Sequence, residues 1–229
     1  MSMSAKIVEC DPTASAKSVA DMLGLQEFRA AMILAGSAQL HSQAHEEKAR
    51  SIIEMIFEVS KDSDSICILD GGIDTGIMAM AAHARAKAKS NVPLIGVAPK
   101  GVLTDDPNAP RLQQDHSHLI VVRGETWGSE TQTLIDLSKE FGKGSTILIL
   151  LGGGENATVE VVTAIRSGIP VYAVEGTGGI AEDLALRRHP QTNAAHLIKK
   201  DWLQTMVHAI EASEAPRDLA VLLSQLSSR

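Results

Sequence analysis

The chain has 229 residues, enough for one large α/β domain, and its 44% hydrophobic and 21% charged residues are ordinary for a globular protein. A formal net charge of -7, only 3% aromatic residues and the lack of a Lys/Arg run disfavour nucleic-acid binding by stacking or through a broad basic surface. No apolar stretch approaches the ~20 residues that cross a bilayer, the N-terminus has no signal-peptide core, and Cys67 falls in a predicted buried strand, so we expect a cytoplasmic protein without a disulfide framework.

The first half of the chain alternates predicted strands with predicted helices. Residues 1–15 show no periodic pattern and are expected to be loosely structured. Beyond them, short apolar runs indicate buried strands, and amphipathic or alanine-rich stretches indicate helices. The predicted elements are a helix over 16–28, a strand over 31–35, a helix over 46–60, a strand over 65–69, a helix over 75–89 and a strand over 91–99.

The second half opens with a long loop over 100–115, which contains Pro107 and Pro110 and no helical stripe. Loops of this length in a compact domain are often functional. The later predicted elements are a strand over 116–123, a helix over 130–141, a strand over 145–151, a helix over 155–166, a strand over 170–174, a helix over 180–186 and two helices over 201–212 and 217–226. The alternation predicts an α/β three-layer sandwich with a mainly parallel sheet over 16–188, and a helical extension of the same domain over 189–229.

A triple-glycine turn follows the predicted strand at 145–151. Gly152, Gly153 and Gly154 lack Cβ, so the turn can bend sharply and a ligand can approach its backbone. The predicted helix beyond it offers free N–H groups and the positive end of a dipole, which suits a phosphate. A tight turn without any ligand explains a single stretch of this kind equally well.

Three further predicted strands end in glycine and a hydroxyl or carboxylate. Because the carboxyl ends of parallel strands meet at one edge of a sheet, the four turns are expected to converge where ligands bind in open α/β sheets. Their number favours a nucleotide-like ligand. The residues expected to contact it are Gly36, Ser37, Gly71, Gly72, Thr75, Gly76, Gly152, Gly153, Gly154, Glu155, Thr158, Gly176 and Thr177.

Several side chains near these turns have two interpretations. Asp70 and Asp74 suit a ribose hydroxyl or a metal, although helix capping by Asp74 is the stronger explanation. Glu160, in the second turn of its helix, suits a general acid, a general base or a ribose ligand, or only a favourable charge near a helix start. Trp127 fits base stacking and packing equally well.

The histidines give no strong metal signal. His116 and His118 are expected to share one face of a strand, but no third ligand has a telling spacing, so no metal and no cofactor are expected. His41 and His45 are expected to face solvent. The fingerprints of ordinary dehydrogenases, phosphate-loop ATPases and serine hydrolases are missing from the sequence.

An ordered set of motifs carries a family resemblance. The motifs are Ala35-Gly-Ser37, Leu69-Asp-Gly-Gly-Ile-Asp-Thr-Gly-Ile-Met78, Pro93-Leu-Ile-Gly-Val-Ala-Pro99, Asp115-His-Ser-His118, Gly124-Glu-Thr-Trp-Gly128 and Leu150-Leu-Gly-Gly-Gly154. Together they resemble the SLOG superfamily, and most closely the prokaryotic relatives of the ligand-sensing domain at the N-terminus of TRPM channels. The resemblance spans about 16–186 and implies a Rossmann-like fold that binds nucleotides or nucleotide-derived ligands such as ADP-ribose-type molecules.

The same superfamily includes the "lonely guy" phosphoribohydrolases, whose signature is Pro-Gly-Gly-x-Gly-Thr-x-x-Glu. The aligned stretch here is Gly152-Gly-Gly-Glu-Asn-Ala-Thr-Val-Glu160, which keeps the middle glycines and the final glutamate. The proline, the later glycine and the threonine are replaced by Gly152, Asn156 and Ala157. Those enzymes carry an Arg-Lys pair on the preceding helix. The corresponding helix here has Lys139 but no arginine, which disfavours catalysis.

Three functions from different classes remain. The first is a binding protein or sensor for a nucleotide-derived, ADP-ribose-like or NAD-like ligand. The second is a nucleoside 5′-monophosphate phosphoribohydrolase, in which Glu160 is the catalytic carboxylate. The third is an assembly subunit whose glycine turns are purely structural. The expected partners are a nucleotide-like small molecule and further copies of the chain in a homo-oligomer, with no nucleic acid and no membrane.

Overall fold

The structure is a computed structural model that describes residues 5–211, 214, 217–218, 221–223 and 225. Within them lies one 8-stranded sheet in which all paired strands are parallel. Its strands are β1 (Lys6–Cys10), β2 (Ala30–Gly36), β3 (Ile66–Asp70), β4 (Leu94–Pro99), β5 (His118–Val122), β6 (Thr146–Leu151), β7 (Val171–Val174) and β8 (Val207–Ile210). The predicted α/β fold with a mainly parallel sheet is confirmed, and the architecture is Rossmann-like.

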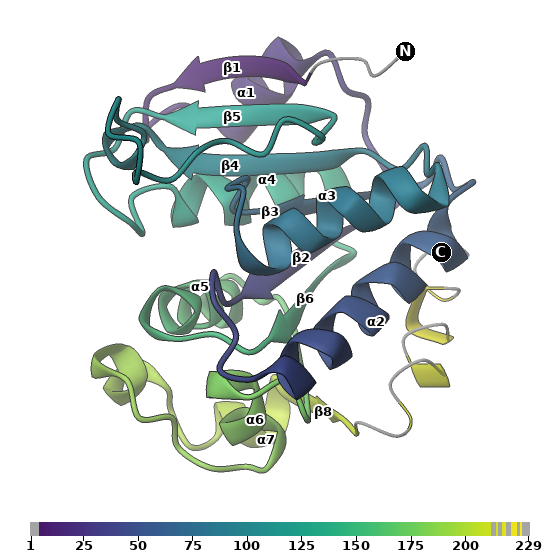
Figure 1. Cartoon of the computed structure of the whole chain (residues 1–229), viewed down its shortest axis with the longest axis vertical. Coiled ribbons are helices and arrows are strands. Elements are labelled where there is room, and N and C mark those ends of the chain that lie inside the picture. The colour runs from purple at the N-terminus through teal and green to yellow at the C-terminus, as the bar shows by residue number, and fades with distance from the viewer. Residues whose placement is uncertain (1–4, 212–213, 215–216, 219–220, 224, 226–229) are drawn as a thin grey trace.

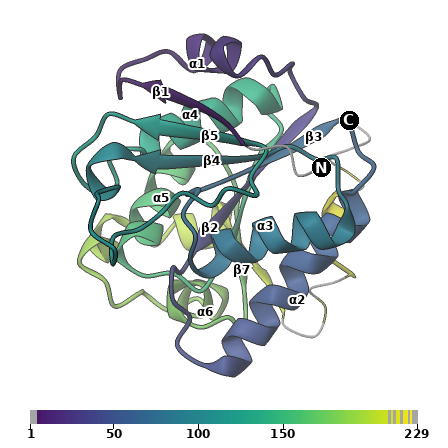
Figure 2. The same cartoon turned by 45° about the horizontal axis from the view of Figure 1, so that its top comes forward.

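Helices cover both faces of this sheet. They are α1 (Ala16–Leu23), α2 (Gln43–Ser60), α3 (Gly76–Ala88), α4 (Thr131–Gly142), α5 (Glu155–Arg166), α6 (Gly179–Ala185) and α7 (Trp202–Thr205), with short 3-10 helices η1 (Lys100–Val102) and η2 (Asn193–Leu197). The helices α2 and α3 pack on one face, and α1, α4, α5 and α6 pack on the other (Figure 1, Figure 2). No helix in the described part of the chain is long and apolar enough to span a membrane.

Alternate residues of each strand enter separate apolar layers. In β2, Ile33 packs with α4 and α5, whereas Met32 packs with α2 and α3. Because both faces of the strand are covered, its sequence is a continuous apolar run rather than an alternating one. The buried strands therefore match the short apolar runs from which they were predicted.

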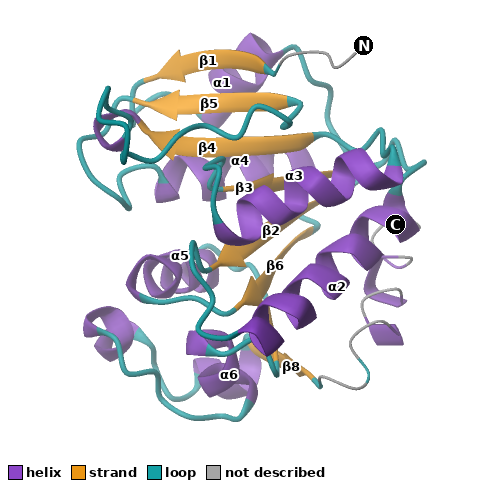
Figure 3. Ribbon diagram, in the orientation of Figure 1, coloured by secondary structure: helices purple, strands orange, loops and turns teal. Residues whose placement is uncertain are grey.

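The strand order places a topological switch point between β2 and β6. The order is β1-β5-β4-β3-β2-β6-β7-β8, so the chain builds outward from β2 on one side and later returns to its other side. Figure 3 shows the strand arrowheads pointing to one edge, where the loops that precede α2, α3 and α5 lie. Gly36 pairs with Leu151 at this edge, so the first and the third glycine turns leave the sheet as neighbours.

The expectation of loose structure at the N-terminus is wrong for residues 6–10. They form β1, an edge strand that pairs in parallel with β5 through, for example, Ile7 and Leu119. Most side chains of β1 stay exposed or half-buried, and Ile7 is exposed. An edge strand with so little buried surface has no strong apolar pattern, which explains why the sequence did not reveal it.

The helix expected over 201–212 is also wrong for its second half. The helix α7 ends at Thr205, and Val207–Ile210 forms β8 in parallel with β7. The spacing of Leu203, Met206 and Ile210 fits a helix face, but the open edge of β7 offers backbone partners, and this tertiary pairing overrides the local pattern. The helix expected over 217–226 lies partly outside the described residues.

Candidate functional site

A cavity of about 280 Å³ lies at the switch point between the ends of β2 and β6. Its lining residues come from the loop after β2 and from the start of α5. They are Gly36, Ser37, Ala38, Gln39, His41, Gly153, Gly154, Glu155, Asn156 and Ala157. The crevice at a switch point is where open α/β sheets bind their ligands. Five of the predicted contact residues therefore surround this cavity: Gly36, Ser37, Gly153, Gly154 and Glu155.

The triple-glycine turn is held by two buried hydroxyl groups. The N–H of Gly152 donates to Oγ1 of Thr177 at 2.9 Å, and the N–H of Gly153 donates to Oγ of Ser37 at 2.6 Å. Both glycines have positive φ angles, 69° and 98°, which favour residues without a side chain. These two hydrogen bonds thus connect three of the four predicted turns and stabilise their conformation.

The first turn of α5 presents unused backbone N–H groups to the cavity. Its N-cap, Gly154, makes no side-chain capping bond, and the N–H groups of Glu155, Asn156 and Ala157 have no acceptor within the helix. All three residues line the cavity. With the positive end of the helix dipole, this arrangement suits an anionic group such as a phosphate.

The side chains of Glu155 and Thr158 serve a structural purpose beside this turn. The carboxylate of Glu155 accepts from the N–H groups of Asn193 and Ala194, each at 2.8 Å, at the start of η2. The buried hydroxyl of Thr158 donates to the carbonyl of Gly154 at 2.9 Å and lies 3.0 Å from Oγ1 of Thr192. The backbone of Glu155 faces the cavity, but its charge is directed to η2.

The second glycine turn is occupied by the 100–115 loop. The N–H of Gly72 donates to Oδ1 of Asp70 at 2.7 Å, and its carbonyl accepts from the N–H of Gln113 at 2.9 Å. Asp74 accepts from Nε2 of Gln113 at 2.7 Å and does not cap α3, because Thr75 is the N-cap. The turn at Gly72 is therefore filled by the chain itself.

The other predicted contact residues lie around this cavity rather than on it. Thr75 is exposed, Gly71 is half-buried, and a Cβ on Gly76 would overlap the backbone of Ser37 and Ala38. The N–H of Gly176 donates to Oε2 of Glu182 at 2.6 Å. The edge of the sheet thus brings all four turns together, and the uncapped start of α5 is the part of it that lines the cavity.

Buried polar side chains lie at the end of β3 and at the start of α4. Asp70, His116 and Glu130 are 0%, 1% and 6% exposed. Nε2 of His116 lies 2.8 Å from Oδ1 of Asp70, and its Nδ1 lies 3.1 Å from the carbonyl oxygen of Gln113. Both ring nitrogens of His116 therefore face oxygen atoms.

Sequence reasoning missed the partnership of His116 and the burial of Glu130. The strand begins at His118, so His116 belongs to the preceding loop and does not share a strand face with His118, whose Nδ1 lies 2.9 Å from Oγ of Ser117. Glu130 immediately precedes α4. Its position two residues after the Gly124-Glu-Thr-Trp-Gly128 motif is the sequence signal that could have identified it.

The surroundings of Glu160 on α5 change its pKa. The pKa of Glu160 is raised to about 8, chiefly because the group is buried. The negative charges of Glu130 and Asp70 raise it further. Burial also raises the pKa of Glu130, an effect partly offset by the backbone N–H groups of Glu130 and Gly128. Glu160 lies one helical turn beyond Asn156 and Ala157, on the same side of α5. At neutral pH it is therefore mainly a protonated acid beside the cavity.

The aromatic side chains and histidines nearby have different surroundings. His41 lines the cavity and is exposed, as expected, but His45 is only half-exposed and its Nδ1 is buried without a hydrogen-bond partner. A Cβ on Gly178 would overlap the ring of His45. Trp127 is 43% exposed, so it is not a core residue.

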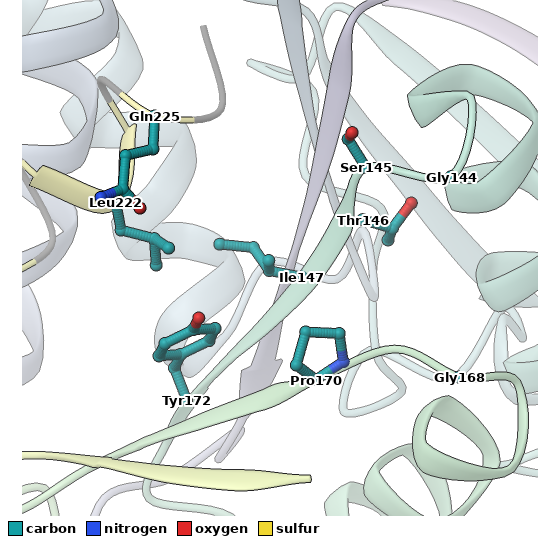
Figure 4. A pocket seen from close by; sticks show the side chains of 9 residues that line it. All are labelled: Gly144, Ser145, Thr146, Ile147, Gly168, Pro170, Tyr172, Leu222 and Gln225. Carbon is teal, nitrogen blue, oxygen red and sulfur yellow. The ribbon is translucent and has the colours of Figure 1, made fainter. Parts of the chain in front are cut away.

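A second cavity, of about 210 Å³, lies at the opposite edge of the sheet (Figure 4). It is lined by Gly144, Ser145, Thr146, Ile147, Gly168, Pro170, Tyr172, Leu222 and Gln225. Ile147, Tyr172 and Leu222 face one another across it in Figure 4. None of these lining residues is charged, and no glycine turn at the carboxyl ends of the strands reaches it. We therefore take the cavity at the switch point as the candidate site.

The parallel sheet, the glycine turns and the switch-point cavity define a Rossmann-like domain. The chain belongs to the family described as SLOG in TRPM, prokaryote, whose model matches residues 29–218. The resemblance seen in the sequence is thereby confirmed, and the family supports a nucleotide-related function in general.

A solved structure shares this fold. The chain is similar to the X-ray structure of TM1055, a structural genomics target, with a TM-score of 0.56 and 15% sequence identity. The similarity covers 86% of this chain and 98% of that one. No curated protein has a sequence that matches this chain.

Proposed function

We propose that the protein binds a phosphate-bearing nucleotide derivative in the cavity between the ends of β2 and β6. One observation carries the proposal: the cavity at the switch point is lined by the backbone of 154–157, the uncapped first turn of α5. A phosphate there accepts hydrogen bonds from N–H groups that have no acceptor in the helix. The family supports the nucleotide-related part of the proposal.

The loop after β2 supplies the other wall of the site. Gln39 and His41 line the cavity opposite the start of α5 and provide side-chain donors for the same ligand. Ser37 joins the two walls through its bond to Gly153. The protein then acts as a sensor that retains an ADP-ribose-like ligand without converting it.

The test is a carboxylate placed in the cavity. Asn156→Asp adds a negative charge at the helix start, which favours the helix dipole but repels a phosphate. We expect the melting temperature of the wild type to rise with at least one of AMP, ADP, ATP, NAD, ADP-ribose and cyclic ADP-ribose, because ligand at a hundred times its Kd adds about 2.7 kcal/mol of stability. Asn156→Asp should fold normally and lose affinity by tenfold or more.

The matched control is Asn91→Asp, the same chemical change at an exposed position before β4, at the far edge of the sheet. It should leave ligand affinity unchanged. If none of the six compounds stabilises the wild type, or if both variants respond alike, the proposed binding site is wrong.

A second candidate function is nucleoside 5′-monophosphate phosphoribohydrolase activity. The observation that favours it is Glu160, a carboxyl group with a pKa of about 8 one turn from the cavity, which can protonate a departing base as a general acid. The same mixtures are analysed for free base. Base release by the wild type that Glu160→Gln abolishes would establish this activity, and retention of intact ligand would eliminate it.

A further inference from the structure

The edge strand β1 has backbone groups that no other part of the described chain uses. Figure 3 shows β1 as the outermost strand on its side of the sheet, next to β5. The N–H of Lys6 and the carbonyl of Cys10 both form hydrogen bonds on the side of β5. Because consecutive residues of a strand direct their backbone groups to opposite edges, Ile7 and Glu9 point away from β5. No other described segment donates to or accepts from the backbone of these two residues.

The side chains of β1 divide between the two faces of the sheet. Val8 is half-buried against the apolar layer of α1 and α4, whereas Ile7 lies on the opposite face and is 49% exposed. Glu9 shares that face and forms ion pairs with Lys100 at 2.9 Å and Arg123 at 3.6 Å. The open edge thus presents an apolar side chain beside a carboxylate whose charge is already compensated.

The strand at the other end of the sheet is blocked. In β8, Val207 points away from β7, and its carbonyl accepts from Nη1 of Arg187 at 2.7 Å. The helices α6 and α7 also contact β8. Natural proteins protect the edges of sheets with charged side chains, prolines, bulges or covering segments. Within the described residues, β1 has a regular register with β5, no proline and no segment paired along its outer side.

We propose that β1 pairs antiparallel with β1 of a second copy of the chain, so that the two sheets join across a twofold axis. A second copy fits because each chain brings the same open edge, and a twofold contact satisfies both edges at once. Since β8 is blocked, the contact closes into a dimer and does not extend into a filament. The inference is independent of the ligand proposed above.

The charges at the two ends of β1 determine the register. A twofold axis perpendicular to the sheet keeps each side chain on its own face, so any residue from Lys6 to Glu9 can lie opposite its own copy. Alignment on Lys6 or on Glu9 places like charges directly opposite each other, which is destabilising. Alignment on Val8 places Ile7 against Glu9 and its two cations. Alignment on Ile7 instead brings the two exposed isoleucines together, and their outward N–H and carbonyl groups exchange two hydrogen bonds.

The experiment measures the mass of the full chain by sedimentation velocity over a dilution series. The wild type should sediment with twice the mass of one chain. Ile7→Lys should raise the dissociation constant of the dimer by roughly tenfold or more, because two lysines then face each other across the axis. Val59→Lys, the same kind of change at a 51% exposed position on α2, should leave that constant unchanged.

Ile7→Pro tests the backbone bonds themselves. Proline has no N–H, and the N–H of Ile7 faces the free edge, so the ladder between β1 and β5 is kept while the bonds across the axis are lost. This variant should be monomeric.

Cysteine variants test the register. Both native cysteines are buried. In the proposed dimer, Ile7→Cys places two thiols on residues whose Cα atoms lie about 5.5 Å apart, a span that a disulfide bridges. Oxidation should therefore give a covalent dimer. Glu9→Cys is the control, since in this register it lies roughly 14 Å or more from its copy and should not cross-link.

A monomeric wild type would overturn the inference, and so would a dimer that survives Ile7→Lys. Cross-linking of Glu9→Cys in preference to Ile7→Cys would also contradict it. If Ile7→Pro fails to fold, the lysine and cysteine variants still decide. None of these outcomes bears on the proposed ligand site, which is lined by the loop after β2 and the start of α5.

Discussion

Thr177 shows how single hydroxyl groups shape this site. Its side chain is completely buried, accepts from the N–H of Gly152 and donates to the carbonyl of Val174 at 2.7 Å. Ser37 holds Gly153 in the same way. These bonds use the N–H groups of the first two glycines internally, so the N–H groups left for a ligand are those of the helix start that follows.

Thr177→Val should therefore destabilise the protein by about 1–3 kcal/mol, since it leaves a buried N–H group without an acceptor at nearly constant side-chain volume. Urea unfolding measures the change. Thr163→Val is the control, because its hydroxyl donates only to a carbonyl of its own half-exposed helix, and it should shift stability by less than about 0.5 kcal/mol. Equal effects of the two changes would show that the hydroxyl of Thr177 has no special importance.

Glu160 should make stability depend on pH. The pKa of Glu160 in the folded protein, about 8, lies above its ordinary value of 4.5, so the folded state binds more protons than the unfolded state between these pH values. The stability present below pH 4.5 is lost as pH rises towards 8. Because the side chain is partly exposed, the loss should be on the order of 2 kcal/mol.

The measurement is urea unfolding of the wild type and Glu160→Gln at several values between pH 5 and pH 8. As pH rises, the free energy of unfolding of the wild type should fall relative to that of Glu160→Gln. A difference that stays constant across this window would mean that Glu160 ionises normally in the folded chain.

Sequence reasoning identified the backbone part of this site better than its side-chain part. Gly153, Gly154 and Ser37 were predicted because a strand, a glycine turn and a helix start recur along the chain, and this pattern is local. The pairing of Asp70 with His116, 46 positions apart, depends on how the 100–115 loop packs. No local pattern in one sequence reveals such a contact.

At the scale of elements, the close approach of β2 and β6 sets the shape of the cavity. Gly36 pairs with Leu151, and a Cβ on Gly36 would overlap the carbonyl of Leu151. Without a side chain on Gly36, the backbones of β2 and β6 stay close up to the point where the two strands end. The glycine is thus required by packing between two strands, and the turn that follows it forms one wall of the site.

Gly36→Ala should cost about 2 kcal/mol or more, because the added methyl group meets rigid backbone of a central strand. Gly154→Ala should cost less, about 1 kcal/mol, since a Cβ there has no atom within 4 Å and the remaining cost is the strain of a side chain at φ -133° and ψ -139°, outside the favoured regions. Thermal or urea unfolding distinguishes the two. A greater loss for Gly154→Ala would contradict the close contact between the strands.

The elements themselves were predictable where they are buried on both sides. The apolar runs of β2, β3 and β6 have one physical explanation, which is a strand covered by helices on both faces. The edge strands β1 and β8 were missed because their pairing depends on neighbours far along the chain. In β8 only Val207 and Ile210 are buried, a spacing that a helix shares.

At the scale of the whole molecule, the order of the strands decides where the candidate site lies. The sheet reverses its direction of growth between β2 and β6, and the glycine turns, the start of α5 and the Asp70–His116 pair all lie at that edge. The second cavity lies at the opposite edge, where β6 and β7 begin, and the uncapped start of α5 does not line it. Of these two cavities, the one at the switch point has the uncapped helix start and is the candidate site.

The central claim is that a phosphate binds at the first turn of α5. The most direct test is a titration of the ¹⁵N-labelled chain with ADP-ribose, followed through the backbone amide resonances. The largest shifts should appear at 154–157 and at 37–41, because these amides surround the cavity at the switch point. Shifts concentrated at 144–147 and Tyr172, around the second cavity, or no shifts with any of the six compounds, would contradict the account.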